Sequence, residues 1–463
     1  MNQNNISAAE LFLRVRELLI LPELEPKTRN KMMHDTLILC CHEGVKETKQ
    51  AFGNLFSQVD YLCKAHGIKV ADKIAIQTMR RHSNSQEPLS SEDLKYDARA
   101  LAIFISAVFG VDVPHELNVL IPHTNRPYQK GLEINNRRIR CIVKNWDSDF
   151  IRVDIDQDAD EEEYLVQLKD EENHIDHTYL WDILKEGMQL NLLDCQVKQP
   201  IITPRLIVVE PDYLVDISSI ATCFTAFGHH PLLYLLNQMK PRANTQATLL
   251  GNFAGAALDD IINTNGKYQM NETIKTNFRE KALEFCTCPW FDAKKFYTDA
   301  NQQAFNLQQV VDILFPRTAS QAQMSAFRGE SLYDRKKAIL EPSFVCEALG
   351  IQGRVDLMTT DCKLLVEQKS GRNMNIETHQ TDPSYHSYQL EPHYVQLLLY
   401  YGVLQHNFKL SNDRVNIRLL YSKYQPQDGL MVVAYYQKLF QEAITYRNQL
   451  VAASFEIAKE GFE

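Results

Sequence analysis

The sequence lacks the features that would place the chain in or beyond a membrane. It has no uninterrupted run of about eighteen apolar residues, the length that a membrane-crossing helix needs. Its start, MNQNNISAAEL, has neither the basic nor the apolar region of a secretory signal peptide. Its ten cysteines are not densely or regularly spaced, so we expect reduced thiols and no disulfide framework. We therefore expect a cytoplasmic protein with no membrane partner.

Repeats, low-complexity segments and nucleotide-binding loops are absent too. Without a GxxxxGK[ST] segment, nucleotide hydrolysis by a P-loop mechanism is not expected. Of the 463 residues, 44% are hydrophobic and 23% are charged, as in ordinary globular proteins. This length predicts about three domains, at roughly 150 residues each.

The net charge of -10 is concentrated in one segment. Between Asp154 and Glu172 there are ten acidic residues and only one basic residue, Lys169, so the remainder of the chain is close to neutral. The acidic total therefore does not exclude a nucleic-acid partner, whose phosphates attract lysine and arginine. An EF-hand loop starting at Asp154 would need glycine and glutamate where Ala159 and Leu165 stand. We interpret the segment as a solvated loop.

The first 125 residues predict a helical domain whose role the sequence does not reveal. Ser7 to Glu10, SAAE, forms a capping-box pattern, and apolar residues follow at helical spacing. The segment from Leu94 to Gly110 has the same periodicity and ends at a glycine, a common helix terminator.

Residues 126-212 predict a small OB-like β-barrel. Five short alternating segments follow one another, separated by polar turns: 137-143, 149-155, 163-168, 188-193 and 205-210. Barrels of this type often bind single-stranded nucleic acid, but a fold does not by itself give a function.

Residues 213-463 predict an α/β domain, because strands and helices alternate there. Helices are expected at 231-239, 248-263, 271-285 and 393-404, with a terminal helix from about Leu430. Two strands are expected in GRVDLM, 353-358, and in KLLVEQK, 363-369.

These two strands carry the charged residues that point to chemistry. Strand side chains alternate, so Glu367 and Lys369 share one face, and Asp356 points away from Val355 and Leu357. The short TTDC segment between the strands predicts a hairpin, in which Asp356 and Glu367 come close together. Two carboxylates in an apolar setting repel each other, and a divalent cation relieves that conflict. Oxygen ligands favour magnesium or manganese, with Lys369 placed to stabilise charge or orient a water.

A downstream helix adds a polar stripe, because His393, Gln396 and Tyr400 fall at i, i+3 and i+7. Each feature alone has an ordinary structural explanation. A carboxylate-x-lysine pair is common, and a glutamine and a tyrosine on one helix often bond to each other at the edge of a core.

Taken in order, the motifs resemble the PD-(D/E)xK nuclease superfamily, specifically its RecB-like clade with GRxD, ExKSG and QxxxY motifs. The matching segments are Gly353 to Asp356, Glu367 to Gly371 and Gln396 to Tyr400. The chain looks most similar to the nuclease half of the eukaryotic replication nuclease-helicases, whose HxxQxxxY helix matches His393. The segment LIVVEPDYLVDISSIATCF also resembles that family, and the resemblance covers roughly residues 128 to 410.

The resemblance implies a restriction-endonuclease-like α/β nuclease core. It also implies that Asp356, Glu367 and the backbone carbonyl of Gln368 hold Mg or Mn, and that Lys369 is catalytic. An acidic position before the GRxD strand corresponds to Glu341. Ser370 and Arg372 correspond to phosphate contacts.

The sequence departs from the family in two places. The early GxxxH motif aligns with Gly251 to Gly255, so glycine replaces the histidine that often binds metal. Many relatives hold an iron-sulfur cluster with one cysteine before the nuclease motifs and three after the QxxxY helix. The last cysteine here is Cys362, so no iron-sulfur cluster is expected, and Cys223 is interpreted as a buried structural cysteine. His229-His230 is likewise interpreted as structural.

The first hypothesis is therefore a metal-dependent deoxyribonuclease acting on single-stranded DNA, flaps or ends. A helicase region or subunit is the expected partner, and the chain is interpreted as the front portion of a longer nuclease-helicase. The alternative is a DNA-binding or protein-scaffolding module with a degenerate site, which Gly255 and the acidic balance motivate. RNA is a third candidate substrate.

Overall fold

The computed structural model describes residues 6–21, 24–48, 52, 54–85, 88–126, 137–155, 163–225, 228–241, 244–264, 267–379, 390–410 and 414–460. Its internal contacts divide the chain into two compact units, Met1–Asp212 with Ala452–Glu463, and Tyr213–Val451. The first boundary falls where the sequence placed the start of its third domain. Residues 156-162, the centre of the acidic run, lie outside the described residues, so the interpretation as a solvated loop stays a prediction. Among the described helices, none has both the length and the apolar character to cross a bilayer.

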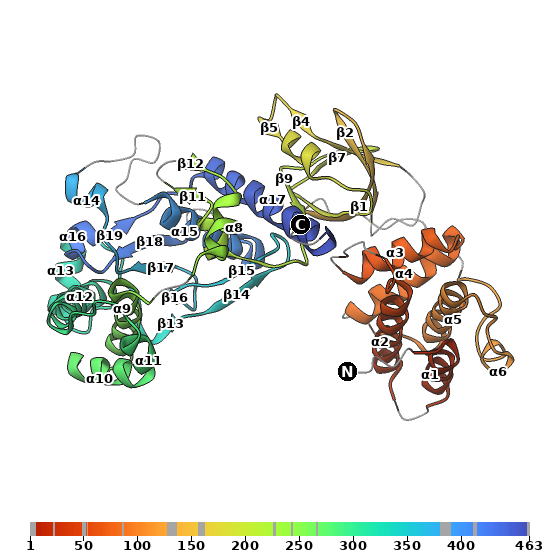
Figure 1. Cartoon of the computed structure of the whole chain (residues 1–463), viewed down its shortest axis with the longest axis horizontal. Helices are drawn as coiled ribbons and strands as arrows, with labels where there is room; N and C mark the ends of the chain where they lie inside the picture. Colours follow the sequence, from red (N-terminus) through yellow and green to blue (C-terminus); the bar gives the residue numbers. More distant parts are fainter. Residues whose placement is uncertain are drawn as a thin grey trace. The chain divides into compact units, whose positions relative to one another are not determined.

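The first unit begins with a group of helices (Figure 1). They are α1 (Ala8–Ile20), α2 (Pro26–Gly44), α3 (Leu55–Ala65), α4 (Val70–Asn84), α5 (Ser91–Phe109) and α6 (His115–Asn118). The side chain of Ser7 caps α1 by accepting from the backbone N–H of Glu10, whose own carboxylate accepts from Arg14. Gly110 ends α5 in the left-handed conformation, as its sequence predicts. Their apolar faces share one buried core, which includes Leu11, Leu37 and Phe104.

A seven-stranded sheet follows in the same unit, in the order β7-β8-β3-β2-β1-β6-β9. Its strands are β1 (Arg138–Trp146), β2 (Phe150–Ile155), β3 (Tyr164–Gln167), β6 (Gln189–Leu193), β7 (Gln196–Lys198), β8 (Ile201–Thr203) and β9 (Leu206–Val209). A side hairpin, β4 (Lys169–Asp170) and β5 (Ile175–Asp176), leads to the 3-10 turn η1 (Thr178–Asp182). All five segments predicted as strands are strands, whereas β7 and β8 were not predicted. Over the residues that the structure describes, the sheet is not closed.

The second unit contains two sheets, a small hairpin and the surrounding helices. Its first half comprises β10 (Val215–Asp216), α7 (Ile217–Ala221), β11 (Phe224–Thr225), β12 (Gly228–His229), α8 (Leu232–Met239), α9 (Gln246–Asn263), α10 (Met270–Glu280), α11 (Ala282–Cys286), α12 (Ala293–Leu314), α13 (Ala319–Phe327) and η2 (Arg335–Lys337). Its second half comprises β13 (Ala338–Leu340), β14 (Ser343–Cys346), β15 (Ile351–Arg354), β16 (Leu357–Thr359), β17 (Leu364–Lys369), α14 (Met374–Thr378), α15 (Glu391–Phe408), β18 (Asn416–Tyr421), α16 (Pro426–Gly429), β19 (Leu430–Val432) and α17 (Gln437–Glu460), of which Ala452–Glu460 belong to the first unit.

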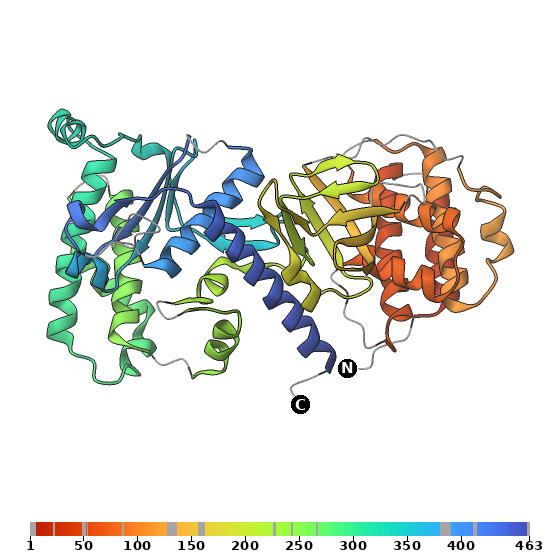
Figure 2. The same cartoon turned by 90° about the horizontal axis from the view of Figure 1, so that it is seen from above.

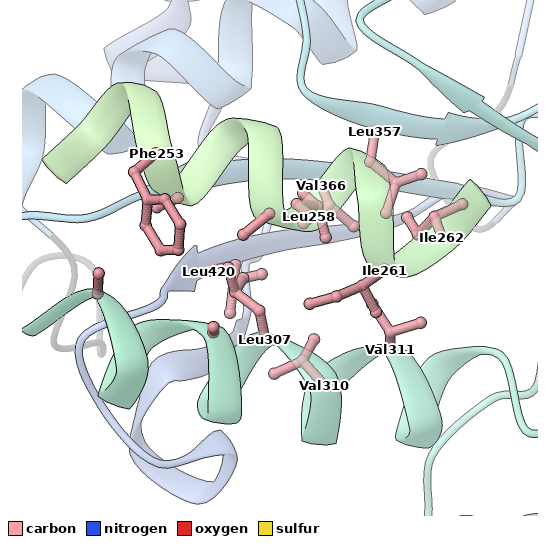
Figure 3. Close-up of a cluster of buried hydrophobic side chains, with 14 of the residues drawn as sticks. Phe253, Leu258, Ile261, Ile262, Leu307, Val310, Val311, Leu357, Val366 and Leu420 are labelled. Atoms are coloured by element: carbon pink, nitrogen blue, oxygen red, sulfur yellow. The ribbon is translucent and has the colours of Figure 1, made fainter. Parts of the chain in front are cut away.

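The main sheet of this unit has the order β13-β16-β17-β18-β19. Only β17 and β18 are parallel, and α15 lies between them in the chain. Helices α9 and α12 run side by side against one face of the sheet (Figure 2). Figure 3 shows their shared core, in which Phe253 and Leu258 from α9 and Leu307 from α12 meet Val366 and Leu420 from the sheet. Because strand side chains alternate, burying Val366 on this face directs Glu367 to the other face.

Three sequence predictions for this unit are wrong in detail. The helix expected over 271-285 is divided at Lys281 into α10 and α11. GRVDLM is not one strand, because β15 ends at Arg354 and β16 starts at Leu357, so Asp356 lies at a joint between two sheets. The terminal helix starts at Gln437, and Leu430–Val432 forms the edge strand β19 instead.

Candidate active site

The joint that carries Asp356 is a local interruption of a long antiparallel pair. The pairing keeps one register on both sides, since Leu340 lies opposite Leu357 and Ser343 lies opposite Arg354. Between these pairs stand Glu341, whose φ is +48°, and Pro342, which has no N–H to donate. Two backbone hydrogen bonds still cross the joint, from Glu341 N–H to the Asp356 carbonyl at 3.0 Å and from Val355 N–H to the Pro342 carbonyl at 3.2 Å. The Asp356 carboxylate accepts from the backbone N–H of Gln368 on β17, at 2.5 Å.

Glu367 lies on β17, beyond the predicted hairpin, and is only 2% exposed. Its Oε1 accepts from Lys369 Nζ at 2.7 Å and from Gln396 Nε2 at 2.6 Å. Its Oε2 is buried and has no hydrogen-bond partner among the described residues. Burial and the neighbouring charge of Asp356 raise the pKa of Glu367 to about 7. Burial also raises the pKa of Asp356. Burial thus suppresses the ionisation of both acids, and the charge of Asp356 adds to the effect on Glu367, which is the electrostatic conflict that the sequence predicts.

Lys369, Glu367 and Gln396 each contact the other two. Lys369 Nζ donates to Glu367 Oε1 and, at 2.9 Å, to Gln396 Oε1. Gln396 is on α15 and contacts both Glu367 and Lys369, so this helix holds these two side chains of β17 in place. An ammonium has three N–H donors. Two are used here, and the third has no partner among the residues that the structure describes.

Tyr400 acts on the joint rather than on the carboxylates. Its hydroxyl donates to the carbonyl of Arg354 at 2.6 Å, just before Asp356. The approach depends on Gly353, because a Cβ there would lie 2.9 Å from Tyr400 Cε1. The close contact between Gly353 and Tyr400 thus explains both the glycine of the GRxD motif and the tyrosine of the QxxxY motif.

His393, like Tyr400, has no hydrogen bond to the two carboxylates within the described part of the chain. Its Nδ1 lies 2.9 Å from the hydroxyl of Tyr421, which also accepts from the backbone N–H of Leu390. Burial and the nearby charge of Lys369 lower the pKa of His393 to about 4. The ring is therefore neutral at pH 7, and its tautomer decides which partner donates in the hydrogen bond between Nδ1 and the Tyr421 hydroxyl.

The remaining predicted residues surround the site. Glu341 is exposed and pairs with Arg354 at 3.0 Å, while its backbone N–H donates to the carbonyl of Asp356. The carbonyl of Ser370 accepts from Gln303 Nε2 at 3.1 Å. Arg372 is exposed and pairs with Glu377. Cys223 is fully buried, as predicted.

The Gln368 carbonyl also faces the Asp356 side. Ser422 N–H donates to the carbonyl of Lys369, so that carbonyl points towards β18. Successive strand carbonyls point to opposite edges, so the carbonyl of Gln368 points towards β16 and Asp356. Beneath it, the Gln368 side chain donates to Ser422, which donates to Gln303 of α12, each at 2.7 Å. This buried chain of polar contacts holds the strand in place.

Sequence reasoning missed Asp259 on α9. Burial, then the charges of Glu341 and Asp356, raise its pKa to about 7, so it lies within the field of the site. Gly251, Gly255 and Asp259 are four residues apart and therefore share one side of the helix. A Cβ on Gly251 would lie 3.1 Å from Ser370 Oγ, whereas one on Gly255 would meet no heavy atom within 4 Å. The signal in the sequence was the acid one turn after the glycine that replaces the family's histidine.

The donor set suits a hard divalent cation. Asp356, Glu367 Oε2 and the Gln368 carbonyl offer only oxygen, and the buried, unpartnered Oε2 is the atom that most needs a partner. Within the described ranges, no group of three or more His, Cys, Asp or Glu side chains is placed to hold a metal. A site with two carboxylates and one carbonyl does not require such a group, because magnesium usually keeps several waters.

Comparisons with known proteins do not identify a family. No protein-family model matches the chain, and no curated protein matches it. The case for a function therefore rests on the residues and their geometry.

Proposed function

We propose that the chain is a metal-dependent deoxyribonuclease that hydrolyses phosphodiester bonds in single-stranded DNA, flaps or ends. The observation that carries the proposal is the buried Oε2 of Glu367, which has no hydrogen-bond partner in the described part of the chain, beside Asp356 and Lys369. An unsatisfied buried oxygen costs about 1 to 3 kcal/mol, and a bound cation would remove that cost. A functional site explains why that cost is retained.

Asp356, Glu367 and the Gln368 carbonyl would hold Mg or Mn. The ion would supply a polarised phosphoryl oxygen and an acidified water. Lys369 would direct its third N–H to the phosphate or the attacking water, because its other two are held by Glu367 and Gln396. Gln396 orients the lysine and Tyr400 fixes the joint. No covalent intermediate is required.

The restriction-endonuclease-like assignment is part of this proposal. The mixed sheet, the hairpin that brings Asp356 to β17 and the return through α15 to a parallel β18 support it. The OB-like assignment of the first unit, a DNA-guiding role for its sheet and a helicase partner are also proposals, and their support is the resemblance in sequence.

The direct test is a manganese-supplemented assay on labelled single-stranded DNA, with an RNA strand as a parallel substrate. Wild type should cleave DNA, and Asp356→Ala and Lys369→Ala should lose cleavage by at least about 100-fold, the effect typical of removing one preorganised charge. Asp361→Ala and Lys363→Ala are matched controls at the opposite end of β17, where Asp361 pairs with Lys337. Cleavage by Lys369→Ala at the wild-type rate would refute the assignment.

A second candidate is a DNA-binding or scaffolding module with a degenerate site, which Gly255 favours. If wild type and both active-site variants are equally inert but still shift DNA, this candidate replaces the nuclease. The open space at Gly255 allows a sharper arm of the test, because Gly255→His restores the histidine that the family pattern contains. Recovery of cleavage in that variant alone would show that the chain is a disabled nuclease.

A further inference from the structure

Beyond the catalytic end of β17 lies a second cluster of charged residues. Because β17 and β18 are parallel, with Lys369 opposite Tyr421, the segments that follow both strands leave the sheet at the same edge (Figure 1). Arg372 follows β17, and Lys423 and Tyr424 follow β18. The two cations have exposed side chains, at 65% and 43%.

Three donors from these segments converge on one carboxylate, that of Glu377 on α14. Arg372 Nε donates to Oε2 at 2.5 Å, and the Tyr424 hydroxyl and Lys423 Nζ donate to Oε1 at 2.9 and 3.4 Å. The hydrogen bond from Arg372 lowers the pKa of Glu377, so the carboxylate is charged at neutral pH. A guanidinium, an ammonium and a hydroxyl around one oxyanion form the donor set that also binds phosphate.

We propose that Arg372, Lys423 and Tyr424 form a phosphate-binding subsite for the backbone of single-stranded DNA, and that Glu377 occupies this subsite until the strand displaces it. The subsite rests on the proposed function, because it positions a strand next to Lys369. The position along the chain supports this placement, since Arg372 is three residues beyond Lys369, at most roughly 10 Å away in an extended chain.

The proposal has two consequences for binding. Removing both cations should weaken binding and reduce its salt dependence, since each phosphate contact on a single strand contributes about 0.7 to the slope of log K against log salt. Removing the charge of Glu377 should strengthen binding by about twofold to fivefold, because a competing surface ion pair is lost. Weaker DNA binding without the two cations and stronger DNA binding without the Glu377 charge would distinguish a subsite with an internal competitor from a general loss of fold.

The test measures fluorescence anisotropy of a labelled thymidine oligonucleotide with the full chain, in EDTA so that cleavage is prevented. The variants are Arg372→Ala/Lys423→Ala and Glu377→Gln. Lys337→Ala and Asp361→Asn are matched controls, because this pair is joined at 3.0 Å at the opposite end of β17. We expect the slope to fall by about 1.4 in the double variant, the affinity to rise in Glu377→Gln, and both controls to behave as wild type. Unfolding temperatures confirm that each variant is folded.

The outcomes separate the subsite from the nuclease. If wild type cleaves DNA but the double variant keeps the wild-type slope, the subsite is wrong and the nuclease stands. If wild type does not cleave DNA in manganese but the slope falls as expected, the subsite stands without the nuclease. Absence of DNA binding by folded wild type, or weaker binding by Glu377→Gln, overturns the subsite.

Discussion

Replacing Glu367 by glutamine should stabilise the metal-free protein at alkaline pH while it removes the response to metal. Glutamine keeps the shape and an oxygen that accepts from Lys369, but it carries no charge to be buried next to Asp356. The Glu367 carboxylate is thus proposed to bind the metal, and its buried charge lowers the stability of the metal-free protein. The substitution separates these two effects.

The magnitude follows from the pKa of Glu367, which is raised from 4.5 to about 7 in the folded protein. Between these values the folded state binds more protons than the unfolded state, so the free energy of unfolding falls as pH rises. At about 1.4 kcal/mol per pH unit, the fall amounts to about 3 kcal/mol, present in full above about pH 7. The side chain is almost fully buried, so solvent screening does not reduce this figure much.

The assay is urea unfolding followed by circular dichroism, for wild type and Glu367→Gln, at about pH 5 and about pH 8, in EDTA and in magnesium. The difference between the two proteins isolates Glu367 from Asp259, whose pKa is also raised to about 7. In EDTA, wild type should lose about 2.5 kcal/mol more than the variant between these pH values, because part of the fall already lies below pH 5. Magnesium should restore wild type at the higher pH, by about 2.7 kcal/mol at 100 times the dissociation constant, and leave the variant unchanged. Equal pH dependence in the two proteins would refute the reasoning.

Three further predictions follow from neighbouring contacts. Gly353→Ala should lower the free energy of unfolding by about 1 to 3 kcal/mol, because its Cβ would press on Tyr400. Gly255 is in a helix and faces open space, so Gly255→Ala should raise the free energy of unfolding by about 0.5 to 1 kcal/mol in the same urea titration. Burial lowers the pKa of His229, but its hydrogen bonds to Glu391 and Glu442, at 2.7 and 2.8 Å, raise the pKa overall. Its contribution is therefore complete below pH 6.5 and lost as pH rises through the raised pKa, and thermal unfolding across this window should show a fall in wild type that His229→Gln lacks. Because the pKa of His393 is lowered to about 4, the ring is neutral above about pH 5. His393→Gln should therefore leave the shape of the pH profile of cleavage unchanged. A new or lost step near pH 6.5 would contradict this prediction.

Short-range rules were sufficient to predict the strand that carries Glu367 and Lys369, β17. The period of two placed these side chains on one face, and the four residues from Thr360 to Lys363 form the turn between β16 and β17. Helical spacing likewise placed Gln396 and Tyr400 on the inner side of α15, where both make their contacts.

What could not be predicted depends on pairs that are distant in the chain. Asp356 lies at a joint whose other side is formed by the left-handed Glu341 and Pro342, between β13 and β14. Asp259 enters the field of the site only because α9 packs on the sheet. Edge strand β19, with three residues, is too short for a periodic pattern to distinguish it from the helix that follows.

The central claim is that Asp356 and Glu367 share one hard cation, and a manganese titration followed by electron paramagnetic resonance tests it most directly. We predict that wild type binds manganese above about pH 7, more weakly as Glu367 becomes protonated, and releases protons on binding. Asp356→Asn and Glu367→Gln should both lose that binding, while Asp361→Asn should keep it. Manganese binding of equal strength in wild type and Glu367→Gln, or none in folded wild type at about pH 8, would contradict the account.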